Sequence, residues 1–410
     1  MVSTRHWNEV EIAVVGGGPA GAAMAIRLAA AGREVALFER WHRPRWRASG
    51  VYSSPSTRTE LSELLGDGAA GSLVRPISEL LVESLSGASV VLVHGTDGPA
   101  VGVDRVRLEA ALLARARQAG AQVHEGAVVR EVVLGSEAGA ADAQLLVSTP
   151  SGQERWRSRL VVGADGPRSL VARSAGVTRR PLPVVRAGLS VHRLDPAALP
   201  DHLPMTARLV FGAGWYVGVT PVPRGRVNVG AVLSRAELQR RLAGKGAPTA
   251  VMNRLLDEIP RRRGELWRNE PIVDQVTVTM PLAHRVARIA GPGFVLVGDA
   301  CGYIDPVSGE GIGRALQGAE LAATAIDRWR NGDRSALSRY DQRLRARYRR
   351  KDLISWILQG FMGQPAMLDY AIRRLDRRPS VRRVFGMVMS DLAPPERALD
   401  PRFLAALLAP

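Results

Sequence analysis

The sequence is poor in cysteine, lysine and aromatic residues. Of its 410 residues one is cysteine and two are lysine, and aromatic side chains make up 5%. The single cysteine, Cys301, excludes an internal disulfide, so we expect a reducing, cytoplasmic setting. The seven histidines and the cysteine show no spacing typical of a metal site, so we expect no bound metal.

Long apolar runs are also missing. No run reaches the length of a membrane span, and the N-terminal residues lack the basic and then apolar order of a signal peptide. Apolar residues make up 46% of the chain, which is typical of a globular protein. A chain of this length holds one large domain or two ordinary ones.

Acidic residues are scarce relative to arginine. The net charge is +17, and residues 331–410 hold sixteen basic and eight acidic side chains. Such a surplus suits an anionic membrane surface or an acidic carrier protein, and it also occurs on a plain solvated helix face. No zinc-finger, RNA-binding or helix-turn-helix signature favours nucleic acid as a partner.

The chain begins with a glycine motif between predicted elements. A short apolar run at 11–15 leads into Gly16-x-Gly18-x-Ala20-Gly21, an alanine-rich helical stretch and a second apolar run that ends at Glu39. In this strand–turn–helix–strand context, the glycines let a pyrophosphate approach the backbone at the helix N-terminus. Glu39 is then placed to accept a hydrogen bond from a ribose hydroxyl.

Two later apolar runs also end in an acid. Residues 160–163 lead into Asp165-Gly166-x-x-Ser169. Residues 294–297 lead into Gly298-Asp299-Ala300, followed by Pro306 and Gly309-Glu310-Gly311-Ile312. Between them, from 181 to 285, prolines and alternating apolar residues predict a mostly antiparallel sheet with a helix near 235–258. After 331 the pattern is helical.

The three motifs, in this order, resemble those of FAD-dependent enzymes with the p-hydroxybenzoate hydroxylase fold. The third motif is most similar to that of the geranylgeranyl reductase branch; the superfamily also contains aromatic monooxygenases and flavin halogenases. The resemblance implies an α/β fold, in which a Rossmann-like FAD-binding domain (1–180 and 286–330) carries an inserted β-sheet substrate domain (181–285). A C-terminal helical cap (331–410) completes this predicted organisation.

The resemblance also implies cofactor contacts. Asp299 is expected to bind hydroxyls of FAD, and the helix from Gly311 to point its N-terminus at the pyrimidine edge of the flavin. A reduced flavin is an anion at that edge, and a helix N-terminus stabilises negative charge by roughly 0.3–2 kcal/mol. The other expected contacts are Arg47, Arg105, Val129, Asp165, Pro306, Gly309 and Ile312.

The substrate half departs from the reductase branch and from the halogenases. Reductases carry YxWxFP and a Cys-Gly pair in a loop beside the flavin. Here Tyr216 and Pro221 match the motif, but Gly218 and Thr220 replace its tryptophan and phenylalanine. Ser49-Gly50 stands in place of Cys-Gly. Tryptophan-type halogenases need an active-site lysine and WxWxIP. Lys245 and Lys351 are both expected to lie far from the flavin loop, which disfavours halogenation.

Three functions stay open at this point. We predict first an FAD-dependent monooxygenase that uses flavin C4a-hydroperoxide chemistry on an apolar or aromatic secondary metabolite, with NAD(P)H or a partner flavin reductase as the source of electrons. The alternatives are a flavin reductase or dehydrogenase of a carbon–carbon double bond and a flavin-binding protein without redox turnover. Tyr52 and Tyr216 are the catalytic candidates, and Ser53, Ser54 and Trp215 are further substrate-facing candidates; packing in the pocket wall is the alternative role.

The apolar residues Trp356, Ile357, Leu358, Phe361 and Met362 follow the basic run Arg343–Lys351. A cap over the substrate pocket is the favoured interpretation, and contact with a membrane surface is the rival. An acidic carrier protein that delivers the substrate is compatible with the charge.

Overall fold

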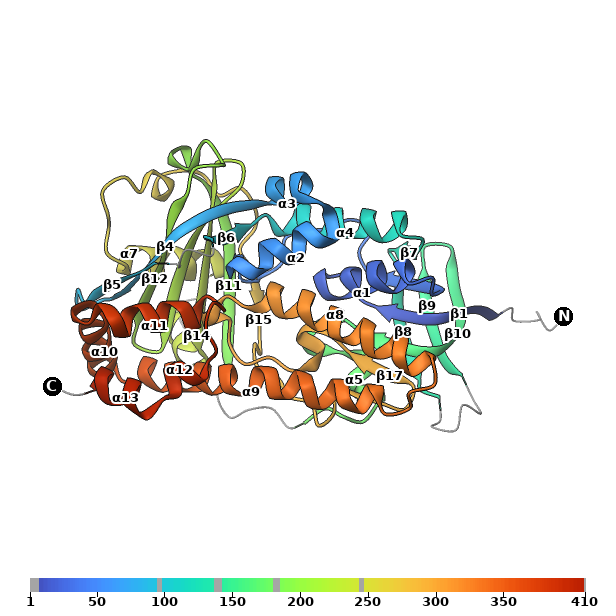
Figure 1. Ribbon diagram of the computed structural model, residues 1–410. Helices are drawn as coiled ribbons and strands as arrows, with labels where there is room; N and C mark the ends of the chain where they lie inside the picture. Colours follow the sequence, from blue (N-terminus) through green and yellow to red (C-terminus); the bar gives the residue numbers. More distant parts are fainter. Residues whose placement is uncertain (1–6, 94–97, 136–141, 180–184, 243–246, 409–410) are drawn as a thin grey trace.

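The computed structural model describes residues 7–93, 98–135, 142–179, 185–242 and 247–408 (Figure 1). Two sheets lie next to each other, one near the N-terminus and one near the C-terminus. The long helix α9 (Ala336–Met362) runs from the first sheet to the helices that cover the second. The α/β fold with C-terminal helices is confirmed.

The first sheet has a parallel centre. Its strand order among the described residues is β16-β17-β10-β1-β2-β7, and β9 pairs with both β10 and β8. The strands are β1 (Trp7–Val15), β2 (Val35–Glu39), β7 (Gln122–Glu125), β8 (Val128–Val133), β9 (Ala143–Thr149), β10 (Gly152–Gly163), β16 (Ala290–Gly291) and β17 (Phe294–Leu296). The three apolar runs before the motifs are therefore the adjacent parallel strands β1, β10 and β17. Their carboxyl ends share one edge of the sheet, which brings the motifs together.

Helices cover this sheet and carry the motif turns. Pro19 lies in the first turn of α1 (Pro19–Ala30), where its missing N–H costs nothing. Helix α1 packs against both α4 (Arg105–Gln118) and α8 (Gly311–Arg330). The remaining helical segments of this half are α2 (Pro55–Leu65), α3 (Asp67–Leu73), α5 (Leu170–Ser174) and the 3-10 turns Gly166–Arg168, Gly298–Cys301 and Pro306–Ser308.

The second sheet has the order β15-β11-β14-β13-β12-β4-β6-β3, with β5 on β4. Its strands are β3 (Tyr52–Ser53), β4 (Val74–Ser84), β5 (Ser89–Val93), β6 (Ala100–Val103), β11 (Arg186–Leu194), β12 (Met205–Gly212), β13 (Trp215–Val222), β14 (Arg226–Ser234) and β15 (Thr277–Thr279). Among these pairs only β4 and β12 are parallel. The sheet also takes strands from outside 181–285, and the predicted division into domains stays a prediction.

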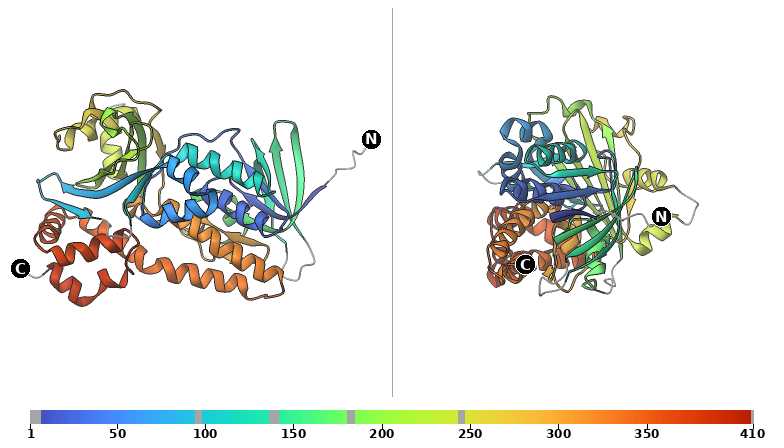
Figure 2. Two further views of the ribbon diagram at one scale, coloured as in Figure 1. Left: turned by 45° about the horizontal axis from the view of Figure 1, so that its top comes forward. Right: turned by 90° about the vertical axis from the view of Figure 1, so that its right-hand side faces the viewer.

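The two faces of the second sheet pack against different helices (Figure 2). One face, with Leu189, Val217 and Val229, forms a core with α6 (Arg235–Leu242) and α7 (Pro248–Glu258). The short turns Pro196–Ala198 and Leu266–Arg268 complete this side. The other face is left for the C-terminal helices and, farther along, for the motif loops.

The C-terminal helices are α10 (Pro365–Arg377), α11 (Pro379–Met389), α12 (Glu396–Leu399) and α13 (Pro401–Leu408). Leu368 and Ile372 of α10 share a core with Phe211 and Val232 of the second sheet. Of the apolar residues expected to form the cap, Leu358, Phe361 and Met362 belong to this core, whereas the side chain of Ile357 is exposed. Within the described part of the chain, every helix is too short or too polar to traverse a bilayer.

Substitution of Ile372 tests how much this core stabilises the protein. Ile372 is 2% exposed, and Met367 on the same helix is 52% exposed. We expect Ile372→Ala to lower the free energy of unfolding by about 2–5 kcal/mol, because it leaves a cavity between helix and sheet. Met367→Ala should change it by less than about 0.5 kcal/mol. Urea unfolding followed by circular dichroism measures both values, and equal effects would show that α10 is not held by this core.

Candidate functional site

The three glycine motifs meet where their strands end. A Cβ atom at Gly16 would lie 2.5 Å from the carbonyl oxygen of Ala164, and one at Gly298 would lie 2.7 Å from the Cβ of Ala20. Both glycines have positive φ angles, +104° and +59°. Glycine alone combines this backbone conformation with such close approach. The first motif therefore touches the second motif through Gly16 and the third through Ala20.

Glu39 holds the first glycine turn in place. Its Oε2 accepts a hydrogen bond from the backbone N–H of Gly17 at 2.7 Å, and its Oε1 accepts one from Trp41 at 3.0 Å. The side chain is buried at the end of β2. The carboxylate is thus oriented by two backbone donors beside the turn, where a ribose would lie, and its contact with that ribose stays a prediction.

Space is left above two of the motif glycines. A Cβ atom at Gly18 would meet only Nη2 of Arg47, at 3.9 Å, and one at Gly311 would have none of the described residues within 4 Å. Both glycines lie at the N-termini of helices, α1 and α8. Helix N-termini carry free N–H groups and favour negative charge. This is the environment that the pyrophosphate and the reduced ring of FAD require.

Two arginines and two acids lie close together near Gly18. Nη2 of Arg47 lies 2.9 Å from both carboxylate oxygens of Glu109, and Nε of Arg105 lies 3.0 Å from Oε1 of the same residue. Burial raises the pKa of Asp299, and the charges of both arginines oppose that shift. The structure therefore brings together Arg47, Arg105 and Asp299, which the sequence predicts as cofactor contacts.

Asp165 caps the turn after β10. Its Oδ2 accepts hydrogen bonds from the backbone N–H groups of Leu170 at 2.6 Å and Val171 at 3.4 Å. Its Oδ1 is buried and has no partner among the described residues. Burial raises the pKa of this carboxyl, while the hydrogen bonds oppose the shift. A buried oxygen without a partner is costly, and the hydroxyl or amide groups of a bound cofactor would satisfy it.

Residues 303–311, which we call the flavin loop, lie against the segment around Gly50. A Cβ atom at Gly50 would lie 4.0 Å from that of Pro306, and one at Gly309 would lie 2.5 Å from a ring carbon of Tyr52. Gly309 has a φ of +67°. Both this backbone conformation and the close approach of Tyr52 require glycine at this position. The catalytic candidate Tyr52 is therefore in contact with the flavin loop.

Two predicted cofactor contacts lie within secondary structure. Ile312 is in the first turn of α8 and is 3% exposed. Val129 is half-buried on β8, where it pairs with Val147 of β9. The strand starts beside Glu39, because the N–H of Ala127 donates to the backbone oxygen of Glu39 at 2.8 Å.

Strand β13 presents alternate residues to the flavin loop. The hydroxyl of Tyr216 donates to Oδ1 of Asp305 at 2.6 Å, so Tyr216 faces this loop. Trp215 lies in the core formed with α6 and α7 on the opposite face of the sheet. The prediction that Trp215 also faces the substrate is wrong, because successive side chains of a strand point to opposite faces.

Ser53 and Ser54 are engaged locally. Both are buried, and their hydroxyls bond to Thr57 at 2.8 Å and Ser56 at 2.9 Å. The hydroxyl of Ser49, by contrast, is buried with no partner in the part of the chain that the structure describes. Ser49 stands where the resemblance leads one to expect cysteine, next to Gly50 and the flavin loop.

A bare strip crosses the sheet face beside Tyr216. Gly218 of β13 pairs with Gly230 of β14, and Ser190 of β11 pairs with Gly230 on its other side. A Cβ atom at Gly218 would come no closer than 3.9 Å to another residue, and one at Gly230 no closer than 3.8 Å. The paired glycines therefore leave room for the flat face of a ligand on the backbone itself.

A polar cluster closes one end of this strip. Nδ1 of His192 lies 2.6 Å from Oδ2 of Asp274, and the side-chain amide of Asn228 donates to the hydroxyl of Ser190 at 3.1 Å. The ring of Trp46 meets that of His192 edge-on, with 4.1 Å between the centroids. Trp46 directly precedes Arg47, so the segment that reaches the cofactor motifs also covers the sheet.

Sequence reasoning missed several members of the site. Glu109 and Asp305 are ordinary acids in their local sequence, and only the fold brings them to the arginines and to Tyr216. His284 pairs through its backbone with Tyr303 of the flavin loop. Burial lowers the pKa of His284 to about 4, so its ring is neutral at pH 7. The local sequence offers no signal for these contacts.

One expectation about the lysines is wrong. Nζ of Lys351 lies 2.6 Å from Oε1 of Glu310, within the flavin loop, although Lys351 follows that loop by a whole helix in sequence. The fold explains this contact, because α9 runs back along α8 toward the loop. Lys245 lies outside the described residues.

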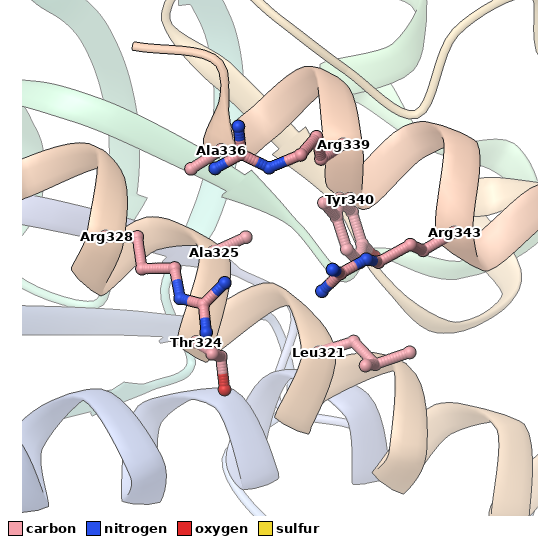
Figure 3. Close-up of a pocket in the computed structure, with 8 residues that line it drawn as sticks. All are labelled: Leu321, Thr324, Ala325, Arg328, Ala336, Arg339, Tyr340 and Arg343. Carbon is pink, nitrogen blue, oxygen red and sulfur yellow. The ribbon is translucent and has the colours of Figure 1, made fainter. Parts of the chain in front are cut away.

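A hollow lies away from the motifs, between α8 and α9 (Figure 3). Three arginines surround its apolar floor, and none of the predicted site residues lines it. The lining residues are Leu321, Thr324, Ala325, Arg328, Ala336, Arg339, Tyr340 and Arg343.

The motif region fits FAD on three counts: the open glycines at two helix N-termini, the oriented acid after β2 and the unpartnered oxygen of Asp165. Comparison with known proteins agrees, because the family model described as FAD binding domain matches residues 9–351. The chain belongs to the FAD-binding-domain family. It is an FAD-dependent oxidoreductase.

Relatives of this FAD-binding protein include two reductases. It is 30% identical over 330 residues to the menaquinone reductase of Mycolicibacterium smegmatis, covering 77% of this chain and 76% of that one. It is also 30% identical over 353 residues to digeranylgeranylglycerophospholipid reductase 2 of Methanothermobacter thermautotrophicus, covering 82% and 83%. A solved geranylgeranyl bacteriochlorophyll reductase-like protein from Thermoplasma acidophilum has the same fold, with a TM-score of 0.76 at 20% identity over 97% of this chain and 100% of that one.

The contact between Gly298 and Ala20 provides a test of the cofactor site. Gly298→Ala should weaken FAD binding at least about tenfold, or about 1.4 kcal/mol, because its methyl group pushes the third motif away from the first. Gly32→Ala is the matched control: Gly32 has a φ of +77°, and a Cβ there would have none of the described residues within 4 Å. The Gly32→Ala variant should lose stability through backbone strain and keep its affinity for FAD. Fluorescence titration of the apoprotein with FAD measures both, and equal affinities for the two variants would contradict the site.

Proposed function

We propose that this protein is an FAD-dependent monooxygenase for a compact, flat substrate of apolar or aromatic character. The observation that carries the proposal is the glycine pair on the sheet face, Gly218 against Gly230, beside Tyr216 and the flavin loop. A ring stacked on this bare backbone lies beside the predicted position of the flavin. The reductase motif would instead place tryptophan at position 218 and so a wall for a flexible chain.

The side chains around the strip suit orientation and exclusion of water better than proton transfer. The hydroxyl of Tyr216 donates a hydrogen bond to Asp305, and both burial and that neighbouring acid raise the pKa of Tyr216. Burial also raises the pKa of Tyr52. Both phenols therefore stay protonated at neutral pH, where they donate hydrogen bonds and form apolar walls. The buried hydroxyl of Ser49 is a further donor for substrate or cofactor.

FAD, when bound, supplies two-electron transfer and, in its reduced form, the reaction with molecular oxygen. In the proposed reaction one oxygen atom enters the substrate and the other leaves as water. NAD(P)H, or a partner reductase, provides the two electrons. Delivery of the substrate on an acidic carrier protein also belongs to the proposal, and the surplus of eight positive charges in residues 331–410 supports it.

Reduction of a carbon–carbon double bond is the second candidate, and the printed functions of the two 30% identical relatives favour it. A reductase must add a hydride to one carbon and a proton to the other, without oxygen. Ser49 in place of cysteine and the absence of tryptophan at Gly218 speak against this reading of the substrate half.

Labelled oxygen separates the two candidates. With NADPH and 2-naphthol as the probe, we expect product formation that requires air and carries one ¹⁸O atom from ¹⁸O₂. Geranylgeraniol under anaerobic conditions is the matched probe for the reductase, and here we expect no product. Mass spectrometry reads both. A geranylgeraniol product heavier by two hydrogens, formed without oxygen, would replace the monooxygenase by the reductase.

The glycine strip can be tested by filling it. Gly218→Trp should lower kcat/KM for the naphthol probe at least about tenfold, or about 1.4 kcal/mol, because the indole occupies the space proposed for the ring. Val278→Trp is the control, since Val278 is 45% exposed on the edge strand β15 and adds the same group elsewhere on the sheet. Steady-state kinetics with FAD-saturated protein gives both values. If Gly218→Trp were as active as Val278→Trp, the ring would not lie on this strip.

A further inference from the structure

Helix α9 reaches the flavin loop at both of the loop's ends. Its C-terminal half lies beyond residue 351, where the match to the family model stops. Lys351 contacts Glu310 at the end of the loop, and Gln359, two turns farther along α9, contacts Asp305 near its beginning. The two contacts lie on either side of Pro306 and Gly309.

The first contact is a buried charge cluster. Nζ of Lys351 donates to Oε1 of Glu310 at 2.6 Å, and Nε of Arg314 donates to Oε2 of the same carboxylate at 2.9 Å. Lys351 also donates to Asp391, which follows α11, so the lysine joins the flavin loop to the C-terminal helices. Lys351 is 8% exposed and Glu310 5%. Water and salt screen buried charges less than surface charges, so the ion pairs of this cluster interact more strongly than surface ion pairs.

The second contact is centred on a buried acid. Oδ1 of Asp305 accepts from the Tyr216 hydroxyl at 2.6 Å and from the N–H of Val307 at 3.0 Å. Its Oδ2 accepts from the amide of Gln359 at 3.3 Å and faces Nη1 of Arg186 at 3.7 Å. The carboxylate of Asp305 thereby connects the beginning of the flavin loop to β13, β11 and α9.

The space between the two contacts is a polar hollow. Residues of the flavin loop line one side, and Asp352 and Ser355 of α9 line the other. The complete lining is Tyr303, Ile304, Asp305, Glu310, Gly311, Arg314, Asp352 and Ser355. Val307 of the loop also belongs to the apolar core that contains Met362 of α9, and the two polar contacts fix the loop on either side of this residue.

We propose that α9 is a clamp on the flavin loop and that Lys351, through Glu310, sets the charge beside the pyrimidine edge of the bound flavin. Glu310 directly precedes Gly311, the first residue of the helix whose N-terminus is predicted to face that edge. The carboxylate of Glu310 opposes the negative charge of a reduced flavin at this place, and Lys351 and Arg314 together neutralise it. Lys351 is therefore a positioning residue, and the inference rests on FAD binding and not on which reaction follows.

The sign of the effect can be worked out for each partner. Lys351→Met removes a positive charge beside the flavin and should lower its midpoint potential, because the anionic reduced form loses stabilisation. Glu310→Gln removes a negative charge and should raise the potential. A tenfold change in the two-electron equilibrium is the expected size in each direction, which corresponds to about 30 mV. The double variant should lie near the unchanged protein.

The experiment uses the full chain saturated with FAD, and spectroelectrochemical titration of the flavin measures the potential. Fluorescence titration gives the FAD dissociation constant of each variant, and thermal unfolding reports on folding. Arg350→Met is the matched control: it removes one positive charge from the neighbouring position of α9, where Arg350 pairs with Glu396 at the surface. Arg350 is 53% exposed, so its variant should leave the potential unchanged.

Opposite shifts for Lys351→Met and Glu310→Gln, which cancel in the double variant, support the clamp. Equal shifts for Lys351→Met and Arg350→Met would mean that only the overall charge matters and would overturn it. Weaker FAD binding in both single variants without opposite potentials would show a purely structural pair and would also overturn it. If Lys351→Met fails to fold, the rise expected for Glu310→Gln alone decides the matter.

Discussion

The close approach of two backbone segments, far apart in sequence, underlies the rest of the structure. Gly298 and Ala20 touch because a side chain is missing on one side of the contact, and Gly16 meets Ala164 for the same reason. These contacts place the N-termini of α1 and α8 on one site. The predicted recognition of a negatively charged cofactor depends on that placement, since helix N-termini carry free N–H groups.

Acids, and not cations alone, define the site around these helix ends. Glu39 fixes the first turn, Glu109 separates and orients two arginines, and Glu310 and Asp305 hold the two ends of the flavin loop. In an arginine-rich chain with a net charge of +17, these buried acids pair with the arginines and orient them. Without them the arginines would repel one another and lose a defined geometry.

The cofactor half could be predicted from the sequence to a large extent, because strand–glycine–helix motifs have local signals and one common edge of a sheet. The strands β1, β10 and β17 and the meeting of Gly16, Asp165 and Asp299 follow from that rule. The partners of those residues could not be predicted. Lys351, Asp305 and His284 reach the site through long-range packing that leaves no local pattern, and Trp215 was misplaced because an alternating strand needs a known face before its residues can be assigned.

The second sheet has a consequence for how the polypeptide acquires its structure. Strand β4 (Val74–Ser84) finds its parallel neighbour only in β12 (Met205–Gly212), so the hairpins made early in synthesis present an open edge until a much later segment emerges from the ribosome. Pairings of this kind are slow to form and expose hydrogen-bonding groups that other chains can capture. Neither half of the chain encodes a complete sheet, because the strands of both sheets come from both halves.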